Sequence, residues 1–423
     1  MEGRGPLVGA LRGERVRESV ARHYATAVPP VLAIVTEIPT PYRAPLYDLI
    51  ASRGTVTPHV LYLVEREVSR TTLAVDLTGH RHEHLRGGGL ALRTRHGPFT
   101  WKWTRGLAAR LDALHPDAVL VSGWAHPAMH VASRWASAHG VPTLVTSESH
   151  PRVHRLRLRT WLRDRVARPL VSRASAWLPV SSRAEVLLER LGADPARCFV
   201  VPNTPDTARF AAAGADLARR RAVRAELGVG HGAADEPVTL FVGRLIPAKG
   251  LDVLLDAAAR RKPGPLLWIA GGGPEAGRLA ARARSLGLQH RVRFLGEQPY
   301  VRVVELCAAA DVIALPSRHE PYGVSLHEGM AAGCAALASD AVGAAHDLVE
   351  EGGSGHVVPT GDAAALCVAW DDLLFDRARL AEMGRAAGRR AAERGQSFAA
   401  SQIERAVAIA MARDGRSVAR GGS

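Results

Sequence analysis

Two series of short apolar segments, each followed by a glycine-rich loop or a helical pattern, constrain the fold of this chain more than any other feature. The segments of the first series are residues 30–36, 57–63, 117–122, 143–146 and 177–180. Those of the second series are residues 238–242, 266–270, 292–295, 311–315, 335–339 and 356–358. Short segments that are apolar throughout are typical of strands buried on both faces of a parallel sheet. The alternation with helices therefore predicts an α/β protein with two doubly wound, Rossmann-like domains.

The composition of the remaining segments predicts the domain boundaries. Residues 1–29 are polar and arginine-rich and lack an apolar secretory core, so we expect a loosely ordered extension. Residues 206–236 are rich in Ala, Arg and Gly and have no strand pattern, which favours a linker. The first domain then covers residues 30–205 and the second covers residues 237–395. We expect residues 396–423 to form a helix and a tail that pack back on the first domain.

One segment of the first domain follows neither the strand pattern nor the helix pattern. Residues 64–97 are polar and glycine-rich. The three consecutive glycines Gly87–Gly89 are typical of a loop, and we expect one there.

The composition indicates neither a membrane span nor a disulfide or metal framework. No apolar run approaches the ~18 residues that a spanning helix needs, so we expect a cytoplasmic protein. The four cysteines are scattered and no pair has metal-ligand spacing, so we assign them no redox role. They are Cys198, Cys307, Cys334 and Cys367.

The net charge of +14 is concentrated in the first half of the chain. Residues 1–205 carry 28 basic and 16 acidic side chains, whereas residues 206–423 carry 27 basic and 25 acidic ones. An excess of cations in one half points to an anionic partner there.

Eight arginines and a single acid, Asp164, lie in the segment from Arg152 to Arg173. Apolar residues recur within it at helical spacing: Leu158, Trp161, Leu162, Val166 and Leu170. A basic amphipathic helix of this kind can make a peripheral contact with an anionic membrane. The alternative is a helix whose apolar stripe packs inward and whose arginines are solvated. Nucleic-acid binding also fits the charge, but the chain has no recognised nucleic-acid-binding motif.

Residues 320–333, E-P-Y-G-V-S-L-H-E-G-M-A-A-G, are typical of a loop and helix that follow a buried strand. Gly323 lies where the helix should begin, and free backbone N–H groups there favour an anion such as a diphosphate. Glu320 lies in the loop and Glu328 in the helix. Carboxylates accept hydrogen bonds from sugar hydroxyls, so this pair could hold the two ends of an elongated ligand. The alternative is that both are ordinary solvated charges.

Residues 242–250, V-G-R-L-I-P-A-K-G, directly follow the first strand of the second domain. Gly243 lets the backbone approach a phosphate, and Arg244 and Lys249 can neutralise its charge. Residues 271–274, G-G-G-P, close the next strand. Neither segment is a Walker loop or a G-x-G-x-x-G fingerprint, so ATP and NAD are not favoured.

Together these motifs resemble family 4 of the retaining glycosyltransferases. The matching segments, in the order of that family, are Val201-Pro202-Asn203, Gly243-Arg244-Leu245 with Lys249-Gly250, the 271–274 loop, Val292–Gly296, Pro316-Ser317 and the E-x7-E pair Glu320 and Glu328. The resemblance covers roughly residues 30–410. It implies a GT-B fold, in which two doubly wound Rossmann-like domains face each other across a cleft.

The resemblance also implies roles for the donor-site residues. Arg244 and Lys249 would bind the diphosphate of a nucleotide-sugar, helped by backbone groups of Gly323 and Val324. Glu328 would hold the ribose hydroxyls and Glu320 would contact the transferred sugar. The other expected donor-site residues are Gly243, Gly272, Phe294, Leu295 and Glu297. Glu320, Arg244 and Lys249 are the expected catalytic residues. Because protein cations would stabilise the leaving diphosphate, we expect no metal and no cofactor.

The first domain departs from the pattern of many relatives, which carry a Gly-Gly loop after the first strand. Here the segment Pro39-Thr40-Pro41-Tyr42-Arg43 replaces it. This form resembles a subset that acts on polysaccharide or lipid-linked acceptors. The expected acceptor-site residues are Tyr42, Arg43, His126, Glu148 and His150.

The resulting expectation is a retaining hexosyltransferase-like enzyme of polysaccharide, glycolipid or glycoconjugate biosynthesis. It would transfer a sugar from a nucleotide-sugar to a saccharide or lipid-linked acceptor. A sugar-nucleotide epimerase of the same fold and a natural-product glycosyltransferase are alternatives. A glycan phosphorylase would need a cofactor lysine, yet Lys102, Lys249 and Lys262 are the only lysines and Lys249 is already assigned to the donor.

Overall fold

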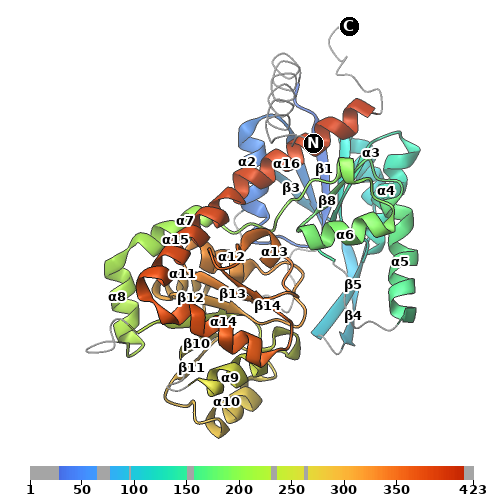
Figure 1. The fold of residues 1–423 in the computed structure, drawn as a ribbon. Helices are drawn as coiled ribbons and strands as arrows, with labels where there is room; N and C mark the ends of the chain where they lie inside the picture. Colours follow the sequence, from blue (N-terminus) through green and yellow to red (C-terminus); the bar gives the residue numbers. More distant parts are fainter. Residues whose placement is uncertain are drawn as a thin grey trace, which may run out of the picture.

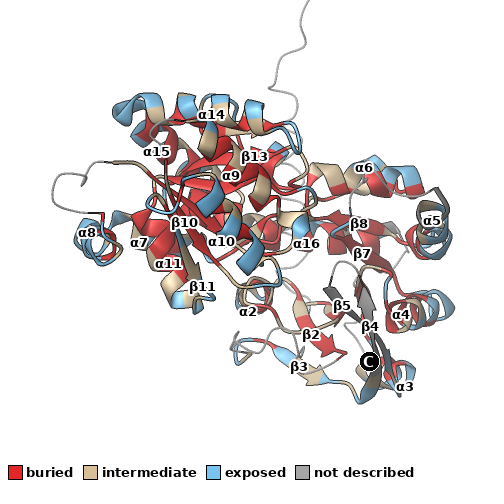
Figure 2. Cartoon of the chain, turned by 90° about the horizontal axis from the view of Figure 1, so that it is seen from below, coloured by how far each residue is buried: buried red, intermediate tan, exposed pale blue. Residues whose placement is uncertain are grey.

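The computed structural model describes residues 28–63, 77–94, 97–149, 157–229, 236–261 and 265–413. It consists of two α/β domains that follow one another along the chain (Figure 1). Figure 2 shows both sheets as buried layers between helices whose outer surfaces are exposed. The predicted pair of doubly wound domains is confirmed. None of the described helices is long and apolar enough to cross a membrane.

The first domain is built on a six-stranded parallel sheet with the order β3-β2-β1-β6-β7-β8. Its strands are β1 (Val31–Thr36), β2 (Thr57–Tyr62), β3 (Arg81–His84), β6 (Ala118–Ser122), β7 (Thr143–Ser147) and β8 (Ala176–Pro179). The strand order reverses between β1 and β6. In open α/β sheets, ligands bind beyond the carboxyl ends of the strands at such a reversal.

Helices cover both faces of this sheet. One face carries α3 (Leu107–Leu114), α4 (Pro127–Ala138), α5 (Arg157–Val171) and α6 (Ser182–Leu191). The other face carries α2 (Ala44–Arg53) and the last helix of the chain, α16 (Gln396–Arg413). The apolar residues of β1 alternate between the two cores, because successive side chains of a strand point to opposite faces.

An antiparallel hairpin, β4 (Gly87–Thr94) and β5 (Gly97–Thr104), projects from the first domain (Figure 1). The prediction of a loop at Gly87–Gly89 is therefore wrong, because these glycines form the start of β4. A Cβ on Gly87 would lie 2.1 Å from the carbonyl oxygen of Trp103, so glycine is required by the close approach of the partner strand. A glycine run more often marks a turn, and the partner strand that explains it cannot be read from the run itself.

Helix α5 only partly follows the apolar stripe expected for the segment 152–173. Leu170 is buried in the core, whereas Trp161, Leu162 and Val166 are exposed. The stripe therefore has one end that packs inward and another that faces solvent. Leu158 lies among residues whose side chains the structure does not describe.

The second domain has a six-stranded parallel sheet with the order β11-β10-β9-β12-β13-β14. Its strands are β9 (Val238–Val242), β10 (Leu266–Ala270), β11 (Val292–Gly296), β12 (Val312–Leu315), β13 (Ala335–Ser339) and β14 (Gly355–Val358). Its longer helices are α9 (Leu251–Arg260), α10 (Ala276–Ser285), α11 (Tyr300–Ala309), α12 (Val324–Ala331), α14 (Ala363–Phe375) and α15 (Arg377–Glu393), and a short helix, α13 (Ala345–Leu348), follows β13.

Most of the described part of the segment expected to be a linker, residues 206–236, instead forms two helices of the second domain. These are α7 (Thr207–Ala215) and α8 (Leu217–Glu226), and each is capped by an aspartate, Asp206 or Asp216. Phe210 and Val223 are fully buried in the core of the second domain. Each helix buries so few apolar residues that the composition of the segment resembles that of a solvated linker.

In the described part of the chain, the two domains make contact through α16 and around the start of α6. Helix α16 leaves the second domain and packs on α2 and β8 of the first, where Ile403 and Val407 are buried (Figure 1). Around the start of α6, the backbone N–H of Ser182 donates to the Asp347 carboxylate at 2.9 Å. Ser181 follows β8, and its Oγ lies 3.2 Å from where a Cβ on Gly343, after β13, would stand. The carboxyl ends of the two sheets therefore face each other.

Candidate active site

The loop after β12 and the first turn of α12 form the centre of the candidate site. Gly323 is the N-cap of α12 and has a φ of 104°, in the left-handed region that favours glycine. A Cβ at this position would also lie 2.7 Å from Cγ1 of Val342. The first N–H groups of a helix have no intrahelical acceptor, so the start of α12 presents donors and a positive dipole to an anion.

Lys249 and Glu320 lie in contact at this site. The Lys249 ammonium group donates to the Glu320 carboxylate, and both side chains are mostly buried. Lys249 follows β9 and Glu320 follows β12, and these strands are neighbours in the sheet. Arg244 lies in the same loop as Lys249, is exposed, and has no ion pair with a described residue. The structure therefore places two cations and the start of a helix beyond neighbouring strands.

The glycines after β9 and β10 hold these two loops against each other. Gly271 has a φ of 147°, and a Cβ there would lie 1.9 Å from the carbonyl oxygen of Gly243. The backbone N–H of Leu245 donates to the carbonyl of Gly272 at 2.7 Å. The sequence suggested that Gly243 and Gly272 belong to the donor site. The structure shows that loop-to-loop packing requires glycine at Gly271 and at Gly273, where a Cβ would lie 2.5 Å from the carbonyl oxygen of Leu245.

Glu328 is almost fully buried in α12, with 7% of its surface exposed. Burial raises the pKa of its carboxyl group to about 8, and a hydrogen bond with Tyr300 acts in the opposite direction. The Tyr300 ring lies edge-on to Phe210, and the guanidinium of Arg209 lies over its face. A buried carboxyl group of this kind can accept hydrogen bonds from ligand hydroxyls, which would favour its charged form. Tyr300 was not predicted from the sequence, because it belongs to none of the motifs.

The expected base-pocket residues lie at the end of β11. Phe294 and Leu295 are half-buried and pack against the core of the second domain. Glu297 is exposed, and its Cγ would lie 3.2 Å from a Cβ placed on Gly272. The ends of β10 and β11 are thus adjacent.

His327 has a structural role that the sequence did not reveal. Its Nε2–H donates to the carbonyl of Ala391 at 2.9 Å, so its Nδ1 accepts from the hydroxyl of Tyr322, also at 2.9 Å. Burial lowers its pKa to about 4, so the ring is neutral at pH 7. These bonds attach the loop before α12 and the helix itself to α15.

In the first domain, Arg43 bonds the end of β6, the residue after β7 and the V-P-N segment. Its guanidinium donates to Glu148 Oε1 at 2.7 Å, to Asn203 Oδ1 at 3.3 Å and to Ser122 Oγ at 3.3 Å. The Asn203 amide also donates to Glu148 Oε1, at 3.1 Å. Burial alone would lower the pKa of Arg43, but the Glu148 carboxylate and Tyr47 outweigh it and raise the pKa. Asn203 belongs to the V-P-N segment, so this network links the first domain to the crossing between domains.

Two other expected acceptor-site residues, His126 and Tyr42, lie at the same edge. His126 caps α4, is buried, and places its Nε2 3.4 Å from Glu37 Oε1. Tyr42 lies in the turn before α2, next to Arg43. His150 falls outside the described residues.

Three buried hydroxyl groups at these edges have no hydrogen-bond partner among the described residues. They belong to Thr40 after β1, Thr204 between the domains and Ser317 after β12. Buried polar groups are normally paired, so unpaired ones around a site are suited to a ligand. No group of three or more His, Cys, Asp or Glu residues in the described part of the chain is arranged to hold a metal ion.

Comparison with known families agrees with this geometry. The family model "Glycosyl transferase 4-like domain" matches residues 56–204, and "Glycosyl transferases group 1" matches residues 226–390. The chain belongs to the GT4-type glycosyltransferases. The two models match the first and the second domain of this chain in turn, and the resemblance inferred from the motifs is confirmed.

Curated relatives of this chain are named as glycosyltransferases. D-inositol 3-phosphate glycosyltransferase of Nocardia farcinica (strain IFM 10152) is 40% identical over 214 residues, which is 48% of this chain and 46% of the relative. Lipopolysaccharide core biosynthesis glycosyltransferase LpsE of Rhizobium meliloti (strain 1021) is 37% identical over 154 residues, 36% of this chain and 44% of the relative. The chain thus spans about half the length of the curated relatives it matches.

Solved structures confirm the GT-B fold. Anabaena Alr3699/HepE in complex with UDP has a TM-score of 0.72 at 20% identity, over 90% of this chain and 99% of that one. Sucrose-phosphate synthase from Thermosynechococcus elongatus has a TM-score of 0.70 at 21% identity, over 89% of this chain and 98% of that one. At these sequence identities the structural similarity shows the fold alone.

Proposed function

We propose that this GT4-type chain transfers a sugar from a nucleotide-sugar to a saccharide or lipid-linked acceptor in polysaccharide, glycolipid or glycoconjugate biosynthesis. The observation that carries the proposal is the contact of Lys249 with Glu320 beside the Gly323-capped start of α12. The names of the curated relatives and the UDP bound in HepE support the same substrate class.

The donor site would act mainly on the leaving diphosphate. Negative charge builds on this group as the sugar leaves, and Arg244, Lys249 and the start of α12 would stabilise it. A phosphate would compete with Glu320 for Lys249, and the Glu320 carboxylate would then contact the transferred sugar. Since protein cations would carry out this stabilisation, we propose that the reaction needs no metal and no other cofactor.

We further propose retention of the anomeric configuration, with departure and attack on the same face of the sugar. Glu328 would bind the ribose hydroxyls, and residues 294–297 would line the base pocket.

The acceptor would bind at the carboxyl edge of the first sheet. Arg43 and Asn203 both bond Oε1 of Glu148, whose side chain is 44% exposed. Its Oε2 has no bond to a described residue and could accept one from an acceptor hydroxyl. The buried His126 next to Glu37 provides a second polar group beyond the neighbouring strand.

We propose a peripheral contact with an anionic membrane through α5. Trp161 and Leu162 are 56% and 49% exposed on a helix rich in arginine, and such a helix can insert aromatic and aliphatic side chains among lipid headgroups. The cytoplasmic location remains a prediction.

The proposal is tested by incubating purified protein and a membrane extract with UDP-, GDP- and dTDP-sugars and measuring nucleotide release. We expect release with one donor class, and loss of release in Lys249→Ala. Failure of every donor to react, together with the absence of a thermal shift with any nucleotide, would contradict it. The curated relatives are named as transferases, so the epimerase alternative is not favoured. Formation of an epimer without sugar transfer would support that alternative instead.

A further inference from the structure

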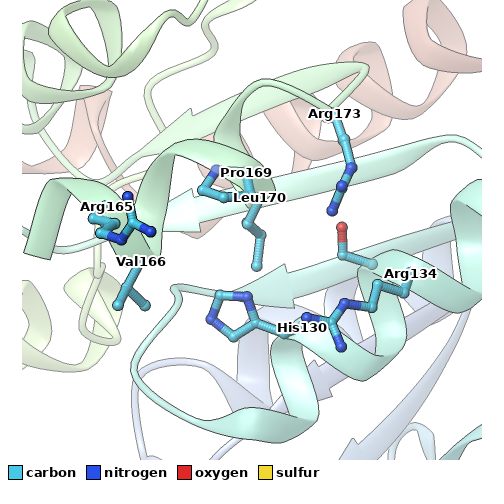
Figure 3. Close-up of a pocket in the computed structure, with 8 residues that line it drawn as sticks. His130, Arg134, Arg165, Val166, Pro169, Leu170 and Arg173 are labelled. Atoms are coloured by element: carbon cyan, nitrogen blue, oxygen red, sulfur yellow. The ribbon is translucent and has the colours of Figure 1, made fainter.

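A cavity of about 240 Å³ lies between α4 and α5 on the outer flank of the first domain (Figure 3). Its lining comes from the middle of α4 and from the last turns of α5 and the residues after it. The lining residues are His130, Ser133, Arg134, Arg165, Val166, Pro169, Leu170 and Arg173. Because α5 leads into the amino end of β8, this part of the helix lies away from the carboxyl edge that holds Arg43 and Glu148. The cavity is therefore separate from the candidate active site.

The cavity has a positive lining. Arg134, Arg165 and Arg173 form no ion pair with any carboxylate in the described part of the chain, and Figure 3 shows Arg134 and Arg173 at one end of the lining residues and Arg165 at the other. The guanidinium of Arg165 lies 5.6 Å from the centre of the Trp161 ring. All three side chains are exposed at the rim of the cavity, and an anion bound there would be attracted by their positive charge.

A buried hydroxyl group adds an independent indication of a ligand. Ser133 is 2% exposed and lines the cavity, and its Oγ has no hydrogen-bond partner among the described residues. An unpaired buried hydroxyl is costly, and a bound acceptor would remove that cost. His130 is already engaged, because its Nε2–H donates to the carbonyl of Trp124 at 3.0 Å.

We propose that this cavity binds a phosphate group carried on a small organic moiety. Guanidinium groups and a hydroxyl are donors suited to phosphate oxygens. Val166, Pro169 and Leu170 form an apolar wall for the carbon part of the ligand. The volume is below that of ordinary small-molecule sites, about 300–1,000 Å³, so it suits a phosphorylated group of the size of glycerol phosphate. The group could belong to a soluble phosphate ester or to a phospholipid headgroup, since Trp161 and Leu162 are exposed on the same helix.

The test uses the full chain and two probes: soluble glycerol 3-phosphate, followed by calorimetry, and phosphatidic acid vesicles, followed by flotation against phosphatidylcholine vesicles. The variants are Ser133→Ala and Arg173→Ala. Arg168→Ala is the matched control, because Arg168 is exposed on the same helix but does not line the cavity. Circular dichroism and nucleotide binding verify that each variant is folded.

We expect Arg173→Ala to weaken binding by about tenfold, as for the loss of one charge-assisted hydrogen bond, and Ser133→Ala to weaken it less. Arg168→Ala should bind nearly as the wild type. Binding of glycerol 3-phosphate would identify a soluble ester as a ligand, and binding of vesicles alone would identify a headgroup. Absence of binding to both probes, or an equal loss in Arg168→Ala and Arg173→Ala, would overturn the proposal.

Discussion

Lys249 and Glu320, which are 71 positions apart in the chain, form an ion pair at the carboxyl edge of the second sheet. Their loops follow β9 and β12, which lie side by side although three helices and two strands separate them in sequence. The pair places a cation and a carboxylate next to the start of α12. It also means that a phosphate must displace the carboxylate before it can use the whole charge of Lys249.

Replacing Lys249 by alanine should weaken donor binding and slow transfer. The loss of one charged contact costs about 1.5–3 kcal/mol, which is roughly 10- to 150-fold in affinity. Donor affinity is measured by calorimetry with the nucleotide. Glu328→Ala should cost a similar amount through the ribose hydroxyls. Unchanged nucleotide affinity in both variants would show that the donor lies elsewhere.

The buried Glu328 should make stability depend on pH. Its pKa in the folded chain is about 8, above that of an unfolded glutamate, so the folded state holds its proton more tightly. Its contribution to stability is complete below about pH 4.5 and is lost as pH rises through about 8. Glu328→Gln cannot ionise, so its Tm should fall less than that of the wild type between pH 5 and pH 9. Parallel curves for the two proteins would contradict this assignment.

Gly271→Ala should destabilise the second domain. The new Cβ would lie 1.9 Å from the carbonyl oxygen of Gly243, and the φ of 147° is unfavourable for alanine. We expect a loss of about 3 kcal/mol or more in the free energy of unfolding, measured in urea. Gly277→Ala is the control. Gly277 lies in α10, and a Cβ added there would meet no atom within 4 Å, so alanine should stabilise by about 0.5–1 kcal/mol.

Glu148→Gln should impair use of the acceptor and leave the donor site intact. Glutamine keeps the shape of the side chain but removes the charge that pairs with Arg43. We expect KM for the acceptor to rise by about tenfold, as for one charged hydrogen bond, while the nucleotide Kd stays the same. An equal loss of nucleotide affinity would place Glu148 at the donor instead.

Trp161→Ser combined with Leu162→Ser should reduce binding to anionic vesicles without destabilising the fold. Both side chains are about half exposed, so their removal should change the free energy of unfolding by no more than about 0.5 kcal/mol. Flotation with phosphatidylglycerol vesicles measures the binding. Full retention of vesicle binding by the folded double variant would exclude α5 as the membrane contact.

The strand–loop–helix order of the second domain and the start of α12 at Gly323 were predictable, because strand burial and helix starts are local signals. The hairpin containing Gly87 and the two helices within residues 206–236 were not. Gly87 is explained only by the nearby backbone of Trp103, and Phe210 only by the core it enters. Neither partner is adjacent in sequence.

The sequence by itself determined which chemical groups follow which strands: Arg43 after the strand at residues 30–36, Arg244 and Lys249 after that at 238–242, and Glu320 after that at 311–315. Only the tertiary structure decided their partners. It joined Arg43 to Glu148 and Asn203, Lys249 to Glu320, and Glu328 to Tyr300. The physical reason is that periodicity reports how each segment is buried, whereas strand order and the meeting of two sheets bring together groups that are distant in the chain.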